Sequence, residues 1–185
     1  MMITLAGFMG SGKTTVGKVL ADFLGCPFMD LDDLIVKKAG KSIPEIFAQD
    51  GESAFRQLEA RLLRQTVEKY TENTVVLALG GGAVTAPASA ALLREKTVCI
   101  YLRASLETLL QRLEGETAGR PLLNEIPGQA GNDGIPAVMP GPDRASVESR
   151  LAQREPLYEQ TAHVIIDTDG LSPDEVADEI IISSL

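Results

Sequence analysis

The chain reads Gly7-Phe8-Met9-Gly10-Ser11-Gly12-Lys13-Thr14 close to its first residue, an octet that matches the phosphate-binding loop (P-loop) pattern G-x-x-x-x-G-K-S/T. An apolar run, 2–6, precedes the octet and a helix-compatible stretch, 13–24, follows it. In this context glycines let backbone N–H groups face a phosphate, and the helix N-terminus adds partial positive charge. The octet therefore predicts a nucleoside triphosphate site, in preference to a plain turn before a helix.

Six loop residues are predicted to contact the nucleotide. Lys13 is expected to reach the β- and γ-phosphates, and the Thr14 hydroxyl to hold Mg²⁺. The nucleotide is expected to be ATP, a co-substrate, and the predicted loop contacts are Gly10, Ser11, Gly12, Lys13, Thr14 and Thr15.

The composition limits the classes of partner. The 185 residues carry a formal charge of −9, whereas nucleic-acid surfaces need clustered Lys and Arg, and an acidic chain is a poor match for anionic membranes. The chain has no apolar run of membrane-spanning length and no basic start typical of a secretory signal. Cys26 and Cys99 fit reduced thiols better than a disulfide or a metal site. We expect one cytoplasmic, monomeric domain (1–185) that binds small molecules.

Apolar runs alternate with helical patterns, which predicts an α/β fold with a parallel sheet. The predicted strands are 2–6, 28–30, 74–79, 97–102 and 163–167. The predicted helices are 13–24, 31–39, 43–50, 52–70, 87–95, 106–113, 144–160 and 173–182. Ser172 is expected to cap the last helix, with Pro173 at its first position and Glu175 three residues on. His163, at a strand start, is expected to be structural.

Acidic residues follow the second predicted strand, where open α/β sheets place ligands. Alternation along a strand would put Asp30 and Asp32 on one side, toward the phosphates. One could hold Mg²⁺ through water, and the other could orient or deprotonate an acceptor hydroxyl. A competing interpretation makes these acids the N-cap and first turn of the next helix, which explains Asp33 better than the other two. The third strand lacks the terminal Asp that binds Mg²⁺ in many P-loop proteins. Asp30 is therefore expected to bind the metal instead.

A glycine triplet and several arginines complete the candidate site. Gly80-Gly81-Gly82 follows a strongly apolar strand and indicates close backbone approach by a ligand. Planar guanidinium groups can grip a carboxylate or a developing phosphoryl charge. The candidates are Arg56, which can pair with Glu59 three residues on, Arg120 and Arg154. Each arginine taken singly would be interpreted as a surface residue.

These motifs together resemble the shikimate kinase family. The P-loop alone fits many nucleotide-binding proteins, but the ordered set is specific and runs through nearly the whole chain. The set comprises Gly7–Thr14, Asp30-Leu31-Asp32, Gly51–Glu59, Gly80–Gly82, Arg120-Pro121-Leu122-Leu123, and Arg154 with Pro156-Leu157-Tyr158. The resemblance implies a three-layer α/β/α P-loop kinase fold like that of nucleoside monophosphate kinases, with a five-stranded parallel sheet of order 2-3-1-4-5. It also implies transfer of phosphate from ATP to shikimate, giving shikimate 3-phosphate, in aromatic amino-acid biosynthesis.

The same resemblance assigns the catalytic and acceptor-binding roles. Lys13, Asp32 and Arg120 would be catalytic, with Asp32 contacting the ring hydroxyls and accepting a proton, and Arg120 swinging over the phosphates from a lid. Arg56 and Arg154 would grip the shikimate carboxylate. Gly80, Gly81 and Gly82 would line the same site, with Gly81 donating a backbone contact.

The remaining assignments concern the metal, the adenine and two regions of the chain. Thr14 and Asp30 would hold Mg²⁺, and Arg112 and Pro173 would sandwich the adenine. Residues 31–60 would form the acceptor-binding region and residues 113–143 the lid.

The segment 124–142 departs from the family pattern, in which a shorter stretch joins Arg-Pro-Leu-Leu to the next helix. It contains four Gly and four Pro with little periodicity, a composition that resists packing. We interpret it as a mobile appendage to the lid; a cover with a role in closure and a neutral surface insertion both stay open.

Three other functions compete with this prediction. A gluconate kinase would also use paired arginines, although the Gly-Glu-x-x-Phe-Arg and triple-glycine motifs favour shikimate. A nucleoside monophosphate kinase is disfavoured because Asp30 and Asp32 would repel a second phosphate. A non-catalytic nucleotide-dependent switch is disfavoured by the intact Lys13, Thr14 and both acids.

Overall fold

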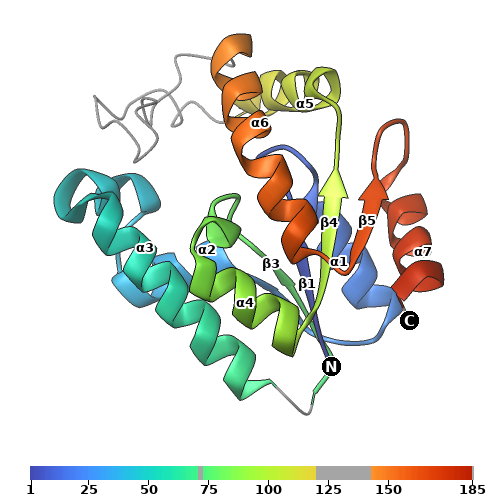
Figure 1. Cartoon of the computed structure of the whole chain (residues 1–185), viewed down its shortest axis with the longest axis horizontal. Helices are drawn as coiled ribbons and strands as arrows, with labels where there is room; N and C mark the ends of the chain where they lie inside the picture. The colour runs from blue at the N-terminus through green and yellow to red at the C-terminus, as the bar shows by residue number, and fades with distance from the viewer. Residues whose placement is uncertain (71–72, 120–142, 185) are drawn as a thin grey trace.

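The computed structural model describes residues 1–70, 73–119 and 143–184, without the side chains of 115–119. In these residues five strands form one parallel sheet in the order β2-β3-β1-β4-β5, which confirms the predicted order (Figure 1). The strands are β1 (Met2–Ala6), β2 (Phe28–Asp30), β3 (Val75–Ala78), β4 (Val98–Arg103) and β5 (Val164–Asp167).

Helices cover both faces of the sheet and give the predicted three layers (Figure 1). Side chains of β1 alternate between the faces: Ile3 and Leu5 pack with residues of α1 and α7, whereas Met2 and Ala6 pack with residues of α2, α3, α4 and α6. The helices are α1 (Lys13–Phe23), α2 (Leu31–Ala39), α3 (Ile43–Lys69), α4 (Pro87–Lys96), α5 (Leu106–Gly119), α6 (Arg144–Thr161) and α7 (Pro173–Ser184), with a 3-10 turn η1 (Ala83–Thr85).

Most predicted boundaries agree with these elements to within about two residues, and two differences are informative. The helices predicted as 43–50 and 52–70 join into α3, with a kink at Gly51, whose φ of 81° and ψ of 167° are not helical. Helix α5 continues to Gly119, beyond the predicted end at Leu113. The predicted cap of α7 is confirmed, because Ser172 and Glu175 exchange hydrogen bonds of 2.8 and 3.3 Å. Residues 124–142 and Arg120 lie outside the described residues.

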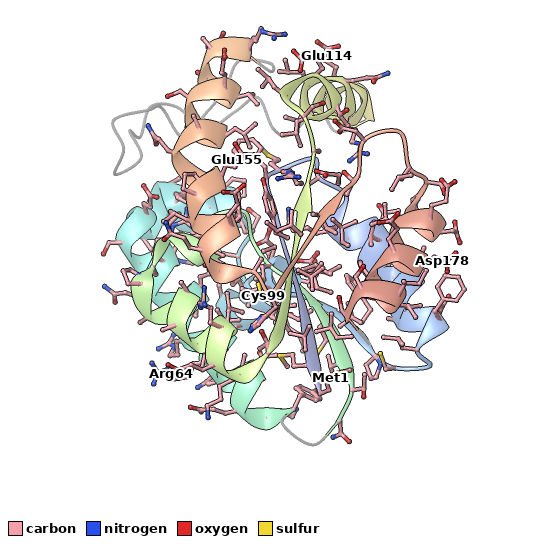
Figure 2. The ribbon with its side chains drawn as sticks, turned by 45° about the vertical axis from the view of Figure 1, so that its right-hand side comes forward. Met1, Arg64, Cys99, Glu114, Glu155 and Asp178 are labelled. Carbon is pink, nitrogen blue, oxygen red and sulfur yellow. The ribbon has the colours of Figure 1, made fainter. Side chains whose placement is uncertain are left out.

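Loops that follow the carboxyl ends of the strands gather at one edge of the sheet. The P-loop follows β1, Asp30 ends β2, and the glycine triplet follows β3. This edge is where open parallel sheets bind ligands. Met1, labelled in Figure 2, marks the opposite edge. None of the helices in the described parts of the chain is long and apolar enough to cross a membrane.

Candidate active site

The P-loop is shaped by its glycines. Gly10 and Gly12 adopt φ of 82° and 91°, which side-chain-bearing residues rarely adopt, and Gly12 is the N-cap of α1. No side chain caps this helix end and no acidic residue lies in its first turn. The Lys13 ammonium donates to the Gly7 and Phe8 carbonyls at 3.0 and 2.8 Å. The first turn of α1 thus presents backbone N–H groups and a cation to an incoming phosphate.

Asp30 links the P-loop to α2. Its Oδ2 accepts a hydrogen bond of 2.9 Å from the Thr14 hydroxyl, and its Oδ1 accepts one of 3.0 Å from the Asp32 N–H. Asp30 is therefore the N-cap of α2. The sequence-based view that helix capping accounts for Asp33 but less well for Asp30 is wrong, because Asp30 itself is the cap and Asp33 lies in the first turn. The alternation argument is also wrong, because the strand ends at Asp30 and Asp32 lies in the first helical turn. A cap satisfies the N–H groups that a starting helix leaves unpaired.

Asp32 lies against the glycine triplet. A methyl group on Gly80 would lie 3.0 Å from Asp32 Oδ1 and 2.7 Å from Glu59 Oε1, so both carboxylates closely approach the backbone at this glycine. Burial, reinforced by the nearby charges of Asp30 and Glu59, raises the pKa of Asp32 to about 6. A carboxylate with this pKa is ionised at neutral pH and is well matched to accepting a proton from a hydroxyl.

Glu59 is a site residue whose burial the sequence did not reveal. Its Oε2 accepts from Arg56 Nη1 at 2.8 Å, which confirms the predicted pairing. The residue is only 4% exposed, and its Oε1 has no hydrogen-bond partner in the part of the chain that the structure describes. Burial raises the pKa of Glu59, and the Arg56 charge opposes that rise. The sequence did indicate that Glu59 could pair with Arg56, three residues before it. Its proximity to Asp32 could not be predicted, because it depends on the contact between α3 and α2.

The two predicted carboxylate-gripping arginines lie on one cleft. Arg56 and Arg154 both line a cavity of about 630 Å³, together with residues such as Gln57 and Gln153 that the sequence did not single out. A methyl group on Gly82 would lie 2.4 Å from Arg56 Nη1, so the triplet borders the same space. The structure therefore brings the arginine pair together with the glycine triplet.

Gly81 is held between the P-loop and α6. A methyl group on it would lie 3.7 Å from both the Gly7 carbonyl oxygen and the Met9 nitrogen. Its own carbonyl accepts a hydrogen bond from the Tyr158 hydroxyl. The Arg154 guanidinium lies over the Phe8 ring at 6.0 Å, so α6 also contacts the P-loop directly.

The predicted adenine residues lie on the other side of the P-loop. Arg112 donates to the Gly10 carbonyl at 3.4 Å and to the Thr168 carbonyl at 3.2 Å, which places it between the loop and the segment after β5. Pro173 begins α7 in that same segment. The adenine role of both residues stays a prediction.

His163 is structural, as predicted. Its Nδ1 accepts from the Cys99 N–H at 3.0 Å, and its Nε2 lies 3.0 Å from the Arg94 carbonyl oxygen. Both cysteines are free thiols, and Cys99, labelled in Figure 2, lies inside the molecule.

Comparison with known proteins gives a consistent result. The family model described as shikimate kinase matches residues 9–184. The shikimate kinase of Salinibacter ruber is 44% identical over 169 residues, covering 91% of this chain and 78% of that protein. The shikimate kinase of Enterococcus faecalis is 39% identical over 182 residues, covering 97% of this chain and 95% of that protein.

A solved structure agrees with these sequence matches. The shikimate kinase of Acinetobacter baumannii, in complex with shikimate, superposes with a TM-score of 0.79 at 34% identity, covering 97% of this chain and 90% of that one. Together with the P-loop, the buried acid and the paired arginines on one cleft, these matches show that the chain belongs to the shikimate kinase family.

Proposed function

We propose that this chain transfers the γ-phosphoryl group of ATP to a hydroxyl of shikimate, giving shikimate 3-phosphate and ADP. The observation that carries the proposal is the position of Asp32. It is tied to the P-loop through Asp30 and Thr14, and it borders the glycine triplet whose other end meets Arg56. A carboxylate with a raised pKa thus lies between the P-loop and a cleft lined by two guanidinium groups, which supports a role in accepting a proton.

The chemistry follows from these positions. The hydroxyl oxygen forms a bond to the γ-phosphorus, the bond from that phosphorus to the β,γ-bridging oxygen breaks, and the hydroxyl proton passes to Asp32. Phosphoryl transfer depends mainly on positioning and charge neutralisation, because its transition state is loose. Lys13 supplies charge at the phosphates, while Arg56 and Arg154 hold the acceptor by its carboxylate. Asp32 at the opposite end orients the attacking hydroxyl.

The metal assignment fits the donor atoms present. Thr14 Oγ1 and Asp30 Oδ2 are oxygen donors of the kind that Mg²⁺ prefers. The two atoms lie 2.9 Å apart, so one ion could contact both. The described residues contain no group of three or more acidic, His or Cys side chains suited to a metal, which agrees with an ion that keeps waters and binds nucleotide phosphates. When bound, Mg²⁺ would neutralise charge on the β- and γ-phosphates.

Several finer assignments stay predictions. Arg120 as a catalytic lid arginine, the lid at 113–143 and the appendage at 124–142 involve residues outside the described part of the chain. Residues 31–60 as the acceptor-binding region agree with the position of Asp32 and Arg56. The cytoplasmic location and monomeric state also remain expectations.

A coupled ADP-release assay with Mg·ATP tests the proposal. Shikimate is compared with gluconate, AMP and no acceptor, and shikimate 3-phosphate is identified by mass spectrometry. Turnover with shikimate alone is the expected result. Faster turnover with gluconate would contradict the acceptor, and ATP binding without any acceptor-dependent ADP would favour a nucleotide switch.

A further inference from the structure

Tyr158 is a buried residue of α6 to which the proposed mechanism gives no role. It lies four residues after Arg154, so both side chains leave the same face of the helix. The ring is fully buried and stacks on Tyr101 of β4, with centroids 5.0 Å apart and an angle of 24°. Because the ring is clamped in this way, the position of its hydroxyl is fixed relative to the sheet.

The Tyr158 hydroxyl joins two parts of the acceptor site. It donates a hydrogen bond to the Gly81 carbonyl, and the positive charge of the Arg154 guanidinium is near enough to oppose the rise in its pKa. A tyrosine hydroxyl has one proton to donate, so donation to Gly81 leaves its lone pairs for the guanidinium. Burial raises the pKa of Tyr158 to about 12, so the hydroxyl keeps its proton at neutral pH.

The peptide between Gly81 and Gly82 then connects the Tyr158 hydrogen bond to the surroundings of Arg56. All peptide bonds in the described residues are trans, so the Gly81 carbonyl and the Gly82 N–H point in opposite directions within one rigid plane. Tyr158 holds the carbonyl end through its hydrogen bond to Gly81. At the other end a methyl group on Gly82 would lie within 2.4 Å of Arg56.

We propose that the Tyr158 hydroxyl is a positioning group that sets the direction of Arg154 and its separation from Arg56, and thereby the fit of the acid acceptor. Its described contacts are with Tyr101 and the Gly81 carbonyl, so the proposal gives it no contact with the reacting atoms. This inference rests on the proposed function, because the acceptor is the molecule that the two arginines hold.

Tyr158→Phe tests the role in the full-length protein, because it keeps the ring and removes only the hydroxyl. We expect the KM for shikimate to rise about 10-fold, a loss within the range typical of one hydrogen bond, with kcat and the KM for ATP unchanged within about 2-fold. Tyr101→Phe is the matched control, because Tyr101 belongs to the same ring stack and donates no hydrogen bond to the glycine triplet in the described contacts. All its kinetic constants should stay within about 2-fold of wild type.

A double-mutant cycle separates positioning from simple stability. With Arg154→Ala as background, Tyr158→Phe should raise the KM for shikimate by about 3-fold or less, because the guanidinium that it positions is already gone. A second full 10-fold rise, an equal rise in the KM for ATP, or a lowered melting temperature with an unchanged KM would overturn the role. Wild-type turnover is measured first: no turnover with shikimate overturns the proposed function and this inference together, whereas normal wild-type turnover with an unchanged Tyr158→Phe overturns only the inference.

Discussion

The proposed nucleotide side and the proposed acceptor side of the site are built in different ways. The nucleotide side consists mainly of backbone: the P-loop glycines, the uncapped start of α1 and the single ammonium of Lys13. The acceptor side consists of charged side chains, two arginines against Asp32 and Glu59. Backbone N–H groups bind phosphate without burying charge, whereas the acceptor side holds two carboxylates whose pKa values burial raises.

This difference has a consequence for catalysis and specificity. Phosphate groups occur in many substrates, so a site made of backbone N–H groups can bind any of them. A small hydroxy-acid is distinguished by the placement of its carboxylate and hydroxyls, which needs groups of both signs at fixed positions. The two sides should therefore respond differently to substitution, the first in kcat and the second in acceptor affinity.

The largest effect is expected from Lys13→Ala on the nucleotide side. Removing a preorganised positive group from the transferring phosphate should lower kcat by about 100- to 1,000-fold, because that charge develops in the transition state. The KM for shikimate should change little. Steady-state kinetics with each substrate varied checks both values, and a large rise in the KM for shikimate would break the proposed division.

The second largest effect is expected from Arg56→Ala on the acceptor side. Loss of a charged hydrogen-bonding partner should cost about 2–3 kcal/mol, which appears as a KM for shikimate raised about 30- to 150-fold. Arg61→Ala is the matched control, because Arg61 lies on the same helix but is exposed and does not line the acceptor cleft. Similar changes in the KM for ATP and for shikimate would contradict the assignment of Arg56.

The same division explains what could be predicted from the sequence. The P-loop, the strand order implied by family resemblance and the pairing of Arg56 with Glu59 depend on residues close in sequence or on a whole-chain motif order. The break at Gly51 was visible as a glycine between two helical patterns, although the structure keeps one kinked helix.

Features of the acceptor side that depend on distant contacts could not be predicted. Glu59 meets Gly80 and Asp32 only because α3 packs beside α2 and the loop after β3. The cap at Asp30 depends on whether the strand ends there or two residues later, and boundaries of that kind are the least certain part of any sequence pattern. The link between Tyr158 and Gly81 joins residues 77 positions apart and has no local signature.

A third prediction concerns the stability of the buried acid. The pKa of Asp32 rises from 3.8 to about 6 in the folded chain. At a pH above about 6 the side chain is ionised in the folded protein, and this ionised form destabilises the fold. Asp32→Asn should raise the free energy of unfolding at pH 8 by about 2 kcal/mol, after allowance for partial exposure. Asp33→Asn, an exposed neighbour in the same helical turn, is the control and should give no such gain.

The sign of this effect gives its pH dependence. Because the folded pKa is raised, the contribution of Asp32 to stability is most favourable below 3.8 and is lost as the pH rises through about 6. The advantage of Asp32→Asn in urea unfolding should therefore shrink between pH 6 and pH 4. An advantage that grows on acidification would show that Asp32 is stabilised as a carboxylate.

The smallest effect is expected in the pH profile of the wild type. If Asp32 accepts the hydroxyl proton, kcat/KM for shikimate should fall about tenfold per unit below the pKa of about 6, because only the ionised form can act. The measurement is made at saturating Mg·ATP, and any net negative charge that the bound nucleotide adds near Asp32 would move the inflection upward. An inflection near pH 4, or a flat profile down to pH 5, would therefore contradict the proton-accepting role while leaving the two arginines as the acceptor grip.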